Sequence, residues 1–260
     1  MHVEEEELLV LKKSFIHMRA LHHESVVAYK ALYFEDSMKT AYLVMEWLDE
    51  YESLTESFIS TEGELKKITK EILSALQYLH SQNICHRDIK PDNIMVHRES
   101  RAVKLIDCGI SKKTYQRGTR REMLTVIGTP FYLAPEMLLG GGYDERVDLW
   151  ALGVTLFRTV TGVTPFESEY RSDTVRNIVA GKVSFEDKAW SEYSSLFSDF
   201  VDRLLKQVDE RISLTEAQQH LWLQGSSQKK IRRSKSEVIV AHEPFHAEMN
   251  THRKNAVSKE

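Results

Sequence analysis

The spacing of apolar and polar residues along the chain predicts a small part that contains strands, followed by a longer helical part. Residues 2–23 place apolar side chains at helical intervals, and the Glu run at 4–7 suits the positive end of a helix dipole. Two runs rich in β-branched and aromatic residues follow at 26–34 and 41–48, with a turn-like segment between them. The beginning of the chain is therefore expected to form one helix and two strands.

A second helix is predicted over residues 61–80, where Leu and Ile recur with the helical period. Thr61 and Glu64 form the sequence signature of a capping box at its start. The chain beyond it is typical of loops and short strands, and the apolar runs at 93–96 and 103–107 are the strand candidates.

Residues 145–161 are apolar on nearly every side, which predicts a helix at the centre of a helical domain. Amphipathic helices are expected at about 171–180, 192–206 and 214–223, the last one behind a Ser213 cap. A larger, mostly helical part thus follows the small one.

Composition and charge narrow the class of protein. The 42% apolar and 28% charged residues are those of an ordinary globular protein, and no apolar run approaches the ~20 residues that span a bilayer. The net charge of −4 does not favour nucleic-acid binding. Two cysteines cannot build a disulfide framework, so we expect a reducing, cytoplasmic or nuclear location, with neither a membrane nor a nucleic acid as partner.

A basic tail is expected behind the folded part, which we place at residues 1–225. Residues 226–260 hold eight Lys and Arg against four Glu and show no sustained period, so they are expected to be disordered. The segment KKIRRSKS at 229–236 allows two interpretations. It is either a motif for nuclear import or for phosphorylation at Ser236, or a solvated linker.

Four polar residues in the loop region could carry chemistry. Asp88, in the segment HRDIKPDN, could act as a general base, and Lys90 puts a compact positive charge beside it. Asn93 and Asp107 offer amide and carboxylate oxygens, which suit Mg²⁺. Each residue taken alone is better interpreted as a solvated loop residue, and only the combination indicates phosphoryl transfer.

These motifs resemble those of the protein kinase family and occur in that family's order. HRDIKPDN at 86–93 is similar to the catalytic loop, and IDCG at 106–109 stands where the family has its Mg-binding D-F-G. GTPFYLAPE at 128–136 is similar to the end of the activation segment. A Lys two residues after the Asp is typical of Ser/Thr kinases, and the resemblance looks closest to the calcium/calmodulin-dependent kinase group.

Two further matches concern residues that would support the catalytic loop. DLWALG at 148–153 resembles the central-helix motif whose Asp, here Asp148, braces that loop in the family. Arg211 stands where the family has an Arg paired with the Glu of A-P-E, which is Glu136 here. The resemblance extends from about residue 3 to residue 223.

The resemblance implies an enzyme that uses ATP and Mg²⁺ to phosphorylate a Ser or Thr hydroxyl of a protein substrate. By position, Asp88 would orient this hydroxyl and accept its proton, and Lys90 would steady the γ-phosphate in transit. Asn93 and Asp107 would hold the Mg²⁺ ion.

The nucleotide would lie between a hinge and a sheet face. Met45 would be the gatekeeper, and the backbone from Glu46 to Leu48 would meet adenine. Met95 would form the floor below the base, and Glu52 falls near the position that often touches ribose.

The resemblance also implies a regulatory phosphate. Thr125 lies four residues before Thr129 of the substrate-contacting stretch, which is the usual place for an activating phosphate. Arg87 would be its partner, because phosphate and guanidinium form strong charge-assisted hydrogen bonds.

The front of the family pattern is missing from this sequence. No G-x-G-x-x-G precedes the hinge, and no Lys stands in the context of the phosphate-binding strand. Ser14 takes the helix position that normally carries the Glu partner of that Lys. Cys108 replaces the Phe of D-F-G, and we interpret it as a small buried filler rather than a redox group.

The fold expected is α+β: a bilobal protein-kinase-like fold with a truncated N-lobe over 1–48 and a complete, mostly helical C-lobe over 49–225. Two functions stay open. In the first, the chain is a Ser/Thr kinase whose activity is impaired because N-lobe strands are missing. In the second, it is a pseudokinase that holds a partner on its C-lobe surface. The 41–48 strand would have an unpaired edge, at which a partner could complete the N-lobe.

Overall fold

The computed structural model of the chain describes residues 3–35, 40–107, 112–113, 115–116, 119–120, 129–140 and 142–225. Within these ranges the side chains are described from residue 11 onward, except in 112–120. The predictions for Cys108, Thr125 and the tail at 226–260 lie outside the described residues and stay predictions.

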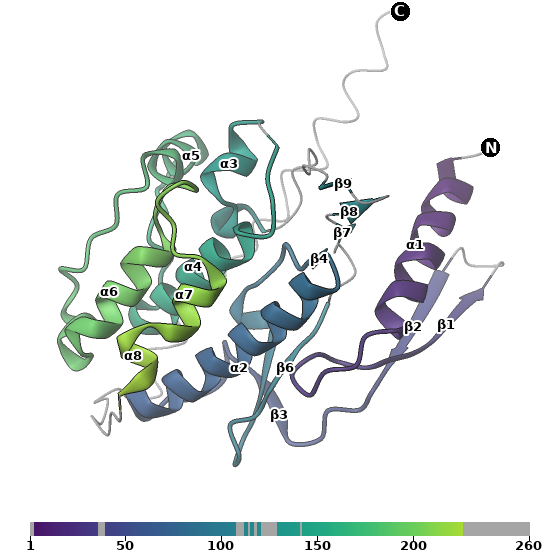
Figure 1. Ribbon diagram of the computed structural model, residues 1–260, viewed down its shortest axis with the longest axis horizontal. Coiled ribbons are helices and arrows are strands. Elements are labelled where there is room, and N and C mark those ends of the chain that lie inside the picture. Colours follow the sequence, from purple (N-terminus) through teal and green to yellow (C-terminus); the bar gives the residue numbers. More distant parts are fainter. Residues whose placement is uncertain are drawn as a thin grey trace, which may run out of the picture.

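One helix and a two-stranded sheet form the small part of the molecule, as the sequence predicts (Figure 1). Helix α1 (Val3–Arg19) packs against strand β1 (Tyr29–Glu35), which pairs antiparallel with β2 (Thr40–Met45). Met18 of α1 is buried, and the partly buried Phe15 packs on the same core. Within the described residues, β2 has a strand neighbour on one side only.

A second antiparallel sheet lies between the small part and the helices. It has the order β3 (Tyr51–Ser53), β5 (Ile94–His97) and β6 (Val103–Leu105), so both strands predicted in this region are confirmed close to their predicted bounds. Val26, just before β1, forms a parallel bridge to Leu105 of β6. This bridge joins the chain of the small part to the second sheet.

Helix α2 (Glu62–Ser81) confirms the predicted helix and its cap. The Thr61 side chain accepts a hydrogen bond from the Glu64 backbone N–H at 3.1 Å. The Glu64 carboxylate reaches back to the backbone N–H of Ser60, at 2.7 Å, rather than to that of Thr61. The capping box therefore differs from the standard pattern in one hydrogen bond: the Glu64 carboxylate binds the residue before the cap.

Helix α4 (Val147–Thr161) is the centre of the large part and is buried along nearly its whole length. It ends at Gly162, whose φ of 83° is in the left-handed region that glycine adopts without strain. Trp150 is fully buried and stacks on Phe166, with ring centroids 5.2 Å apart. The predicted all-round apolar helix is therefore confirmed.

The helix predicted at 214–223 is divided into α7 (Leu214–Gln219) and α8 (Leu221–Gln224). His220 between them is extended, and its Nδ1 accepts a hydrogen bond from the backbone N–H of Trp222 at 3.2 Å. Its Nε2 contacts Asp199 Oδ2 at 3.0 Å. The break places the Trp222 side chain in the core, where it is 1% exposed.

The remaining elements surround α4 and connect the parts. Two helices lie at the predicted places, α5 (Arg171–Ala180) and α6 (Ser195–Leu204). Besides β3, the short elements that the sequence pattern did not predict are the strands β4 (Ile84–Cys85), β7 (Lys112–Lys113), β8 (Tyr115–Gln116) and β9 (Thr119–Arg120), the 3-10 helices η1 (Pro91–Asn93), η3 (Pro130–Tyr132) and η4 (Lys188–Glu192), and α3 (Pro135–Leu138). Among the described residues, no helix combines the length and the apolar character needed to cross a membrane. The fold is α+β and bilobal, with few strands in the small part.

Candidate active site

The segment HRDIKPDN forms a loop between β4 and β5, and a single buried carboxylate holds its start. The two oxygens of Asp148 in α4 accept hydrogen bonds from the backbone N–H groups of His86, at 2.9 Å, and Arg87, at 2.8 Å. Arg87 has a φ of 68°, which is uncommon for a residue other than glycine. The two bonds stabilise this turn of the backbone, so the structure places Asp148 where the sequence predicts a brace.

Asp148 also joins helix α2 to the loop. His80 of α2 places its Nε2 atom 2.8 Å from Asp148 Oδ2. Burial by itself raises the pKa of Asp148, but the hydrogen bond and charge of His80, with the backbone N–H of Arg87, lower the pKa below its usual value. The carboxylate therefore stays ionised and accepts three hydrogen bonds.

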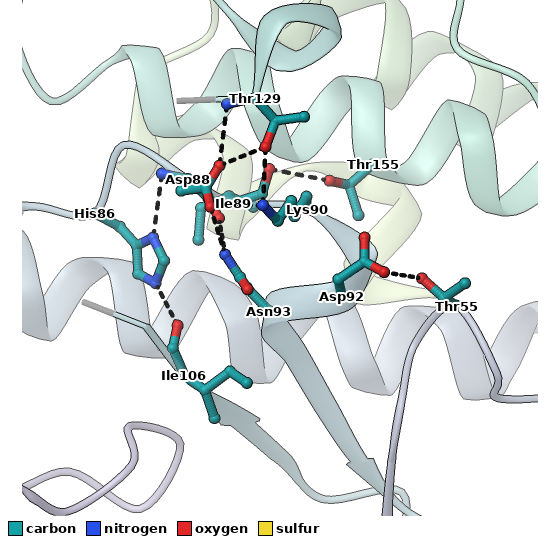
Figure 2. A network of polar contacts seen from close by, with 10 residues as sticks. All are labelled: Thr55, His86, Asp88, Ile89, Lys90, Asp92, Asn93, Ile106, Thr129 and Thr155. Atoms are coloured by element: carbon teal, nitrogen blue, oxygen red, sulfur yellow. Dashed lines mark hydrogen bonds and ion pairs between the residues drawn. The ribbon is translucent and has the colours of Figure 1, made fainter. Parts of the chain in front are cut away.

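Asp88 lies at the centre of a network of polar side chains (Figure 2). Its Oδ2 atom is 2.8 Å from Lys90 Nζ and accepts a hydrogen bond of 2.8 Å from Asn93 Nδ2. Its Oδ1 atom accepts hydrogen bonds from the backbone N–H of Thr129, at 3.2 Å, and from the Thr129 hydroxyl, at 2.9 Å. The three residues predicted as catalytic therefore lie in direct contact.

The charge of Asp88 follows from these contacts. The residue is only 6% exposed, and burial alone raises the pKa of its carboxyl. The hydrogen bonds from Lys90, Thr129 and Asn93 act in the opposite direction, and the pKa is lowered from its usual value as a net result. Asp88 is thus ionised at neutral pH, as a general base that takes a proton from a hydroxyl must be.

The position of Thr129 differs from the role that the sequence indicates. The sequence names it only as a member of the substrate-contacting stretch, four residues after the regulatory Thr125, whereas the structure places its hydroxyl between Asp88 and Lys90. Lys90 Nζ donates to Thr129 Oγ1 at 2.8 Å, and Thr129 donates in turn to Asp88. Thr129 is therefore part of the candidate site itself.

Asn93 and Asp107, the predicted metal ligands, lie at the same end of the second sheet. Asn93 directly precedes β5, Asp107 follows β6, and the backbone N–H of Ile106 donates to the carbonyl of Asn93 at 3.0 Å. The Asn93 amide uses its N–H₂ group for Asp88, which leaves its oxygen for a cation. Asp107 is exposed. One amide and one carboxylate oxygen fit Mg²⁺, which keeps waters and takes phosphate oxygens as its other ligands.

The hinge residues lie between β2 and the second sheet. Met45 ends β2 and is 38% exposed, and Leu48 packs against the core. The Glu46 side chain points inward: its Oε1 atom accepts from the backbone N–H of Ala28 at 2.8 Å and is 2.7 Å from Lys104 Nζ. Glu46 is thus a structural brace of the hinge. Its backbone N–H donates to the carbonyl of Ala28 at 2.8 Å, which leaves its backbone carbonyl to meet adenine.

The register of the second sheet separates two of the predicted nucleotide contacts. Directly opposite residues of an antiparallel pair share a face, and Glu52 is opposite Val96, whereas Ser53 is opposite Met95. Met95 is partly exposed, while Val96, which projects to the opposite face of the sheet, is buried. Glu52 therefore faces away from Met95, and its carboxylate is 3.3 Å from Arg98 Nε. The predicted contact of Glu52 with ribose stays a prediction.

The predicted pair of Glu136 and Arg211 is present. Arg211 Nη1 and Nη2 donate to the two carboxylate oxygens of Glu136 at 2.7 and 3.0 Å. Arg211 further donates to the carbonyls of Arg146, at 2.9 Å, and Lys206, at 3.1 Å. The pair ties α3, which follows the substrate-side stretch, to the segment between α6 and α7.

Arg87 is the predicted partner of a regulatory phosphate. It is 7% exposed, and its Nε and Nη1 atoms are buried without a hydrogen-bond partner among the described residues. Unpaired buried donors of this kind are costly and uncommon. Thr125 lies outside the described residues, so the pairing itself stays a prediction.

The phosphate-binding Lys of the family has no counterpart among the described residues. Lys12 and Lys13 are exposed on α1, and the Lys12 ammonium lies over the ring of Phe34, 4.8 Å from its centroid. Ser14, the predicted neutral replacement on this helix, is partly buried.

Sequence reasoning missed two histidines that position the loop. His86 is fully buried, its Nε2 is 3.1 Å from the carbonyl of Ile106, and its Nδ1 accepts from the backbone N–H of Asp88. Burial lowers the pKa of His86, so the ring is neutral. His86 is the first residue of the HRDIKPDN motif, so the sequence could have indicated its role. No local pattern indicates that His80 contacts Asp148.

The fold and this site define a protein kinase, and comparison with known proteins agrees. A profile of the protein kinase domain matches residues 6–223. The chain therefore belongs to the protein kinase family.

Three relatives illustrate the similarity. The chain is 32% identical over 233 residues to Serine/threonine-protein kinase H1 homolog of Danio rerio, which covers 86% of this chain and 54% of that protein. It is 32% identical over 216 residues to Myosin light chain kinase A of Dictyostelium discoideum, covering 81% and 72%. It is 32% identical over 218 residues to Calcium-dependent protein kinase 5 of Plasmodium falciparum (isolate 3D7), covering 82% and 37%. The chain thus spans about half the length of the first of these relatives, and by family it is a Ser/Thr protein kinase.

Proposed function

We propose that the chain transfers the γ-phosphate of ATP to a Ser or Thr hydroxyl of a protein substrate. The observation that carries the proposal is the contact of the ionised Asp88 carboxylate with Lys90 and Asn93. A solvated loop would not keep a carboxylate and an amide buried together with a partly exposed ammonium beside them.

The contacts of the Thr129 hydroxyl support this proposal. It donates to Asp88 Oδ1 at 2.9 Å and accepts from Lys90 Nζ at 2.8 Å. An acceptor hydroxyl of the substrate needs the same two interactions, because Asp88 must take its proton and Lys90 must balance the charge on the phosphoryl group. We propose that the substrate hydroxyl replaces or joins Thr129 at Asp88 Oδ1.

The remaining residues would hold the nucleotide. Bound MgATP would supply the phosphoryl group and the cation that offsets its charge. Asn93 and Asp107 would ligate that cation through one oxygen each, and Met95 would contact the base from the face of β5 that carries it. Met45 and the backbone of Glu46 would border the base from the hinge.

Regulation by phosphate is a further part of the proposal. A phosphate on Thr125 would give the buried Nε and Nη1 of Arg87 the acceptors that they lack among the described residues. Such a contact would tie Thr125, four residues before Thr129, to the catalytic loop beside Asp88.

A pseudokinase is the second candidate, and a specific observation favours it. The sequence contains neither a glycine-rich loop nor a Lys in the phosphate-binding context, and Ser14 replaces the partner of that Lys. In this case the C-lobe surface would hold a partner protein without chemistry. In the first case, a partner or further strands that complete the sheet at β2 would restore full activity.

The two candidates are separated by phosphotransfer from radiolabelled ATP to a mixture of Ser and Thr peptides. The assay uses residues 1–260 and a chimera in which the leading strands of the Danio rerio relative's kinase domain precede Met1. We expect transfer by the chimera and its loss by 100-fold or more in Asp88→Asn. Asp92→Asn, the same charge change in the same loop, is the control and should transfer at nearly the parent rate. Transfer that Asp88→Asn leaves intact would refute the proposed role of this site.

A further inference from the structure

A cavity of about 430 Å³ borders the candidate active site. Four segments form it: the connection from β3 to α2, the catalytic loop at Pro91, the last turn of α4, and η4. Pro91 comes three residues after Asp88, so one wall of the cavity belongs to the loop that carries the proposed base. A cavity of this volume can hold a few side chains of a peptide.

The cavity is left open by the segment between β3 and α2 and by the end of α4. The residues between β3 and α2 contain no helix, and the backbone N–H of Leu54 bonds instead to the carbonyls of Pro91, at 3.1 Å, and Ile94, at 2.8 Å. Helix α4 ends at Gly162, and a Cβ atom added there would meet nothing within 4 Å. The space beyond the helix end is therefore open.

The lining combines apolar walls with charged groups that have no partner. Leu54, Ile59 and Tyr193 are buried wall residues. Arg158 is partly buried and Lys188 is exposed, and neither side chain forms a hydrogen bond or an ion pair with any residue that the structure describes. An unpaired guanidinium in a partly buried wall is a strong site for a carboxylate, because its planar fork can donate two parallel hydrogen bonds.

The position of Arg158 relates the cavity to the reaction. The Thr155 hydroxyl lies 3.5 Å from the carbonyl of Ile89, next to Asp88, so this face of α4 meets the catalytic loop (Figure 2). Arg158 is one turn further along the same face. A substrate chain bound with its hydroxyl at Asp88 would therefore pass close to the cavity.

We propose that this cavity binds an acidic side chain of the protein substrate and that Arg158 is the residue that recognises it. The proposal rests on the proposed kinase function and names the substrate class for the same site. An Asp or Glu carboxylate would pair with Arg158, with Lys188 as a second cation at the rim. The apolar walls would contact the stem of that side chain or a neighbouring apolar residue.

Three carboxylates, of Glu192, Asp92 and Glu167, could repel an acidic side chain, but the two cations of the lining outweigh them. Glu192 is the only acidic residue of the lining, against two cations. Asp92 and Glu167 are not part of the lining, and each already accepts a hydrogen bond, from Thr55 at 3.2 Å and Thr164 at 3.0 Å. A substrate Lys or Arg would face the Arg158 guanidinium and be repelled, so basic substrates are disfavoured.

The test measures peptide binding to residues 1–260 without nucleotide. Fluorescein-labelled eleven-residue peptides carry a central Ser in an Ala and Gly background, and a single Glu is moved through every other position. We expect one or two neighbouring positions to strengthen binding about tenfold, the size of one charge-assisted hydrogen bond at a partly exposed site. Arg158→Glu should abolish that gain and create a similar gain for Lys at the same position, while Arg158→Lys should keep part of it.

The control is Arg19→Glu, which makes the same charge change at an exposed position of α1 and should bind all peptides as the parent does. Binding that does not depend on the position of Glu, or a gain that survives Arg158→Glu, would overturn the proposal. Equal competition by inorganic phosphate and by the best peptide would also overturn it, because the site would then bind small anions only. If the chimera binds peptides with the expected pattern but never transfers phosphate, the proposed kinase function is refuted. The proposed site for an acidic side chain is then still supported.

Discussion

The guanidinium of Arg211 and the carboxylate of Glu136 form an ion pair with two hydrogen bonds, of 2.7 and 3.0 Å, across 75 residues of sequence. The Arg211 side chain is completely buried, and the Trp150 ring lies 5.1 Å from its guanidinium carbon. The guanidinium donates two further hydrogen bonds, from Nη1 to the carbonyl of Arg146 and from Nε to the carbonyl of Lys206. A buried charge of this kind depends on its partner.

Glu136→Gln should therefore lower the free energy of unfolding by about 3 kcal/mol, because it leaves the buried Arg211 charge uncompensated. Urea unfolding followed by circular dichroism measures this change. Glu169→Gln removes the same charge at an exposed position and should change the stability by less than about 0.5 kcal/mol. Equal effects of the two substitutions would show that the buried pair contributes nothing beyond surface charge.

Gly153→Ala in α4 should destabilise the protein, although this substitution normally stabilises a helix by up to about 1 kcal/mol. A Cβ atom at this position would lie 2.9 Å from Leu204 Cβ and from two side-chain atoms of Leu205. The overlap should cost about 1–3 kcal/mol, because these leucines are fully buried and have no room to move. Thermal unfolding gives the sign, and a rise of the melting temperature would contradict the close packing of α4 on α6.

Stability should fall as the pH drops below about 6.5, where an unperturbed imidazole begins to bind a proton. Burial lowers the pKa of His86 in the folded protein, so the unfolded chain takes up the proton first and unfolding is favoured by acid. Burial lowers the pKa of His23 as well, with the same sign. The lowered pKa of Asp148 adds a further loss at more acidic pH, below its ordinary value near 4.

His86→Gln should make the melting temperature less dependent on pH between 6.5 and 5, while His23 retains part of the effect. His22→Gln is the control, because the His22 residue is exposed. Melting curves recorded at half-unit pH steps measure the slope. An unchanged slope in His86→Gln would show that this buried ring is not the group that acid titrates.

Millimolar MgATP should leave the melting temperature of residues 1–260 unchanged. Two of the three phosphate-holding elements of the family, the glycine-rich loop and the Lys, are absent from the sequence, and only the oxygens of Asn93 and Asp107 are available. Without the hydrogen-bond donors of the glycine-rich loop and of the Lys, nucleotide binding should be weaker by roughly a thousandfold. The chimera with completed strands should show a thermal shift that Asp88→Asn preserves. A shift with residues 1–260 alone would mean that the nucleotide is held in another way.

The helical part of the fold could be predicted because its signals are local. The helix expected at 171–180 is found as Arg171–Ala180, since the apolar period ends at Gly181, which takes a left-handed φ of 62°. The break at His220 could not be predicted, because it depends on a contact with Asp199 and on the burial of Trp222. No local pattern of the sequence contains either interaction.

The site shows the same division. Asp88, Lys90 and Asn93 could be found from the spacing of a single loop, because five residues cannot separate them far in space. The hydroxyl of Thr129, 41 residues from Asp88, comes to the base only through tertiary packing. The face on which Glu52 lies depends on the register of β3 against β5, and a shift by one residue would reverse it.

The hydrogen bonds of Asp148 have a consequence for folding. This carboxylate connects α4 to His80 of α2 and to the backbone of His86 and Arg87, over 61 to 68 residues of sequence. Contacts of such separation form late, after the entropy of closing the intervening chain has been overcome. The loop around Asp88 should therefore gain its order only when the two helices dock. It should then share their cooperative protection from hydrogen exchange instead of opening as a separate local unit.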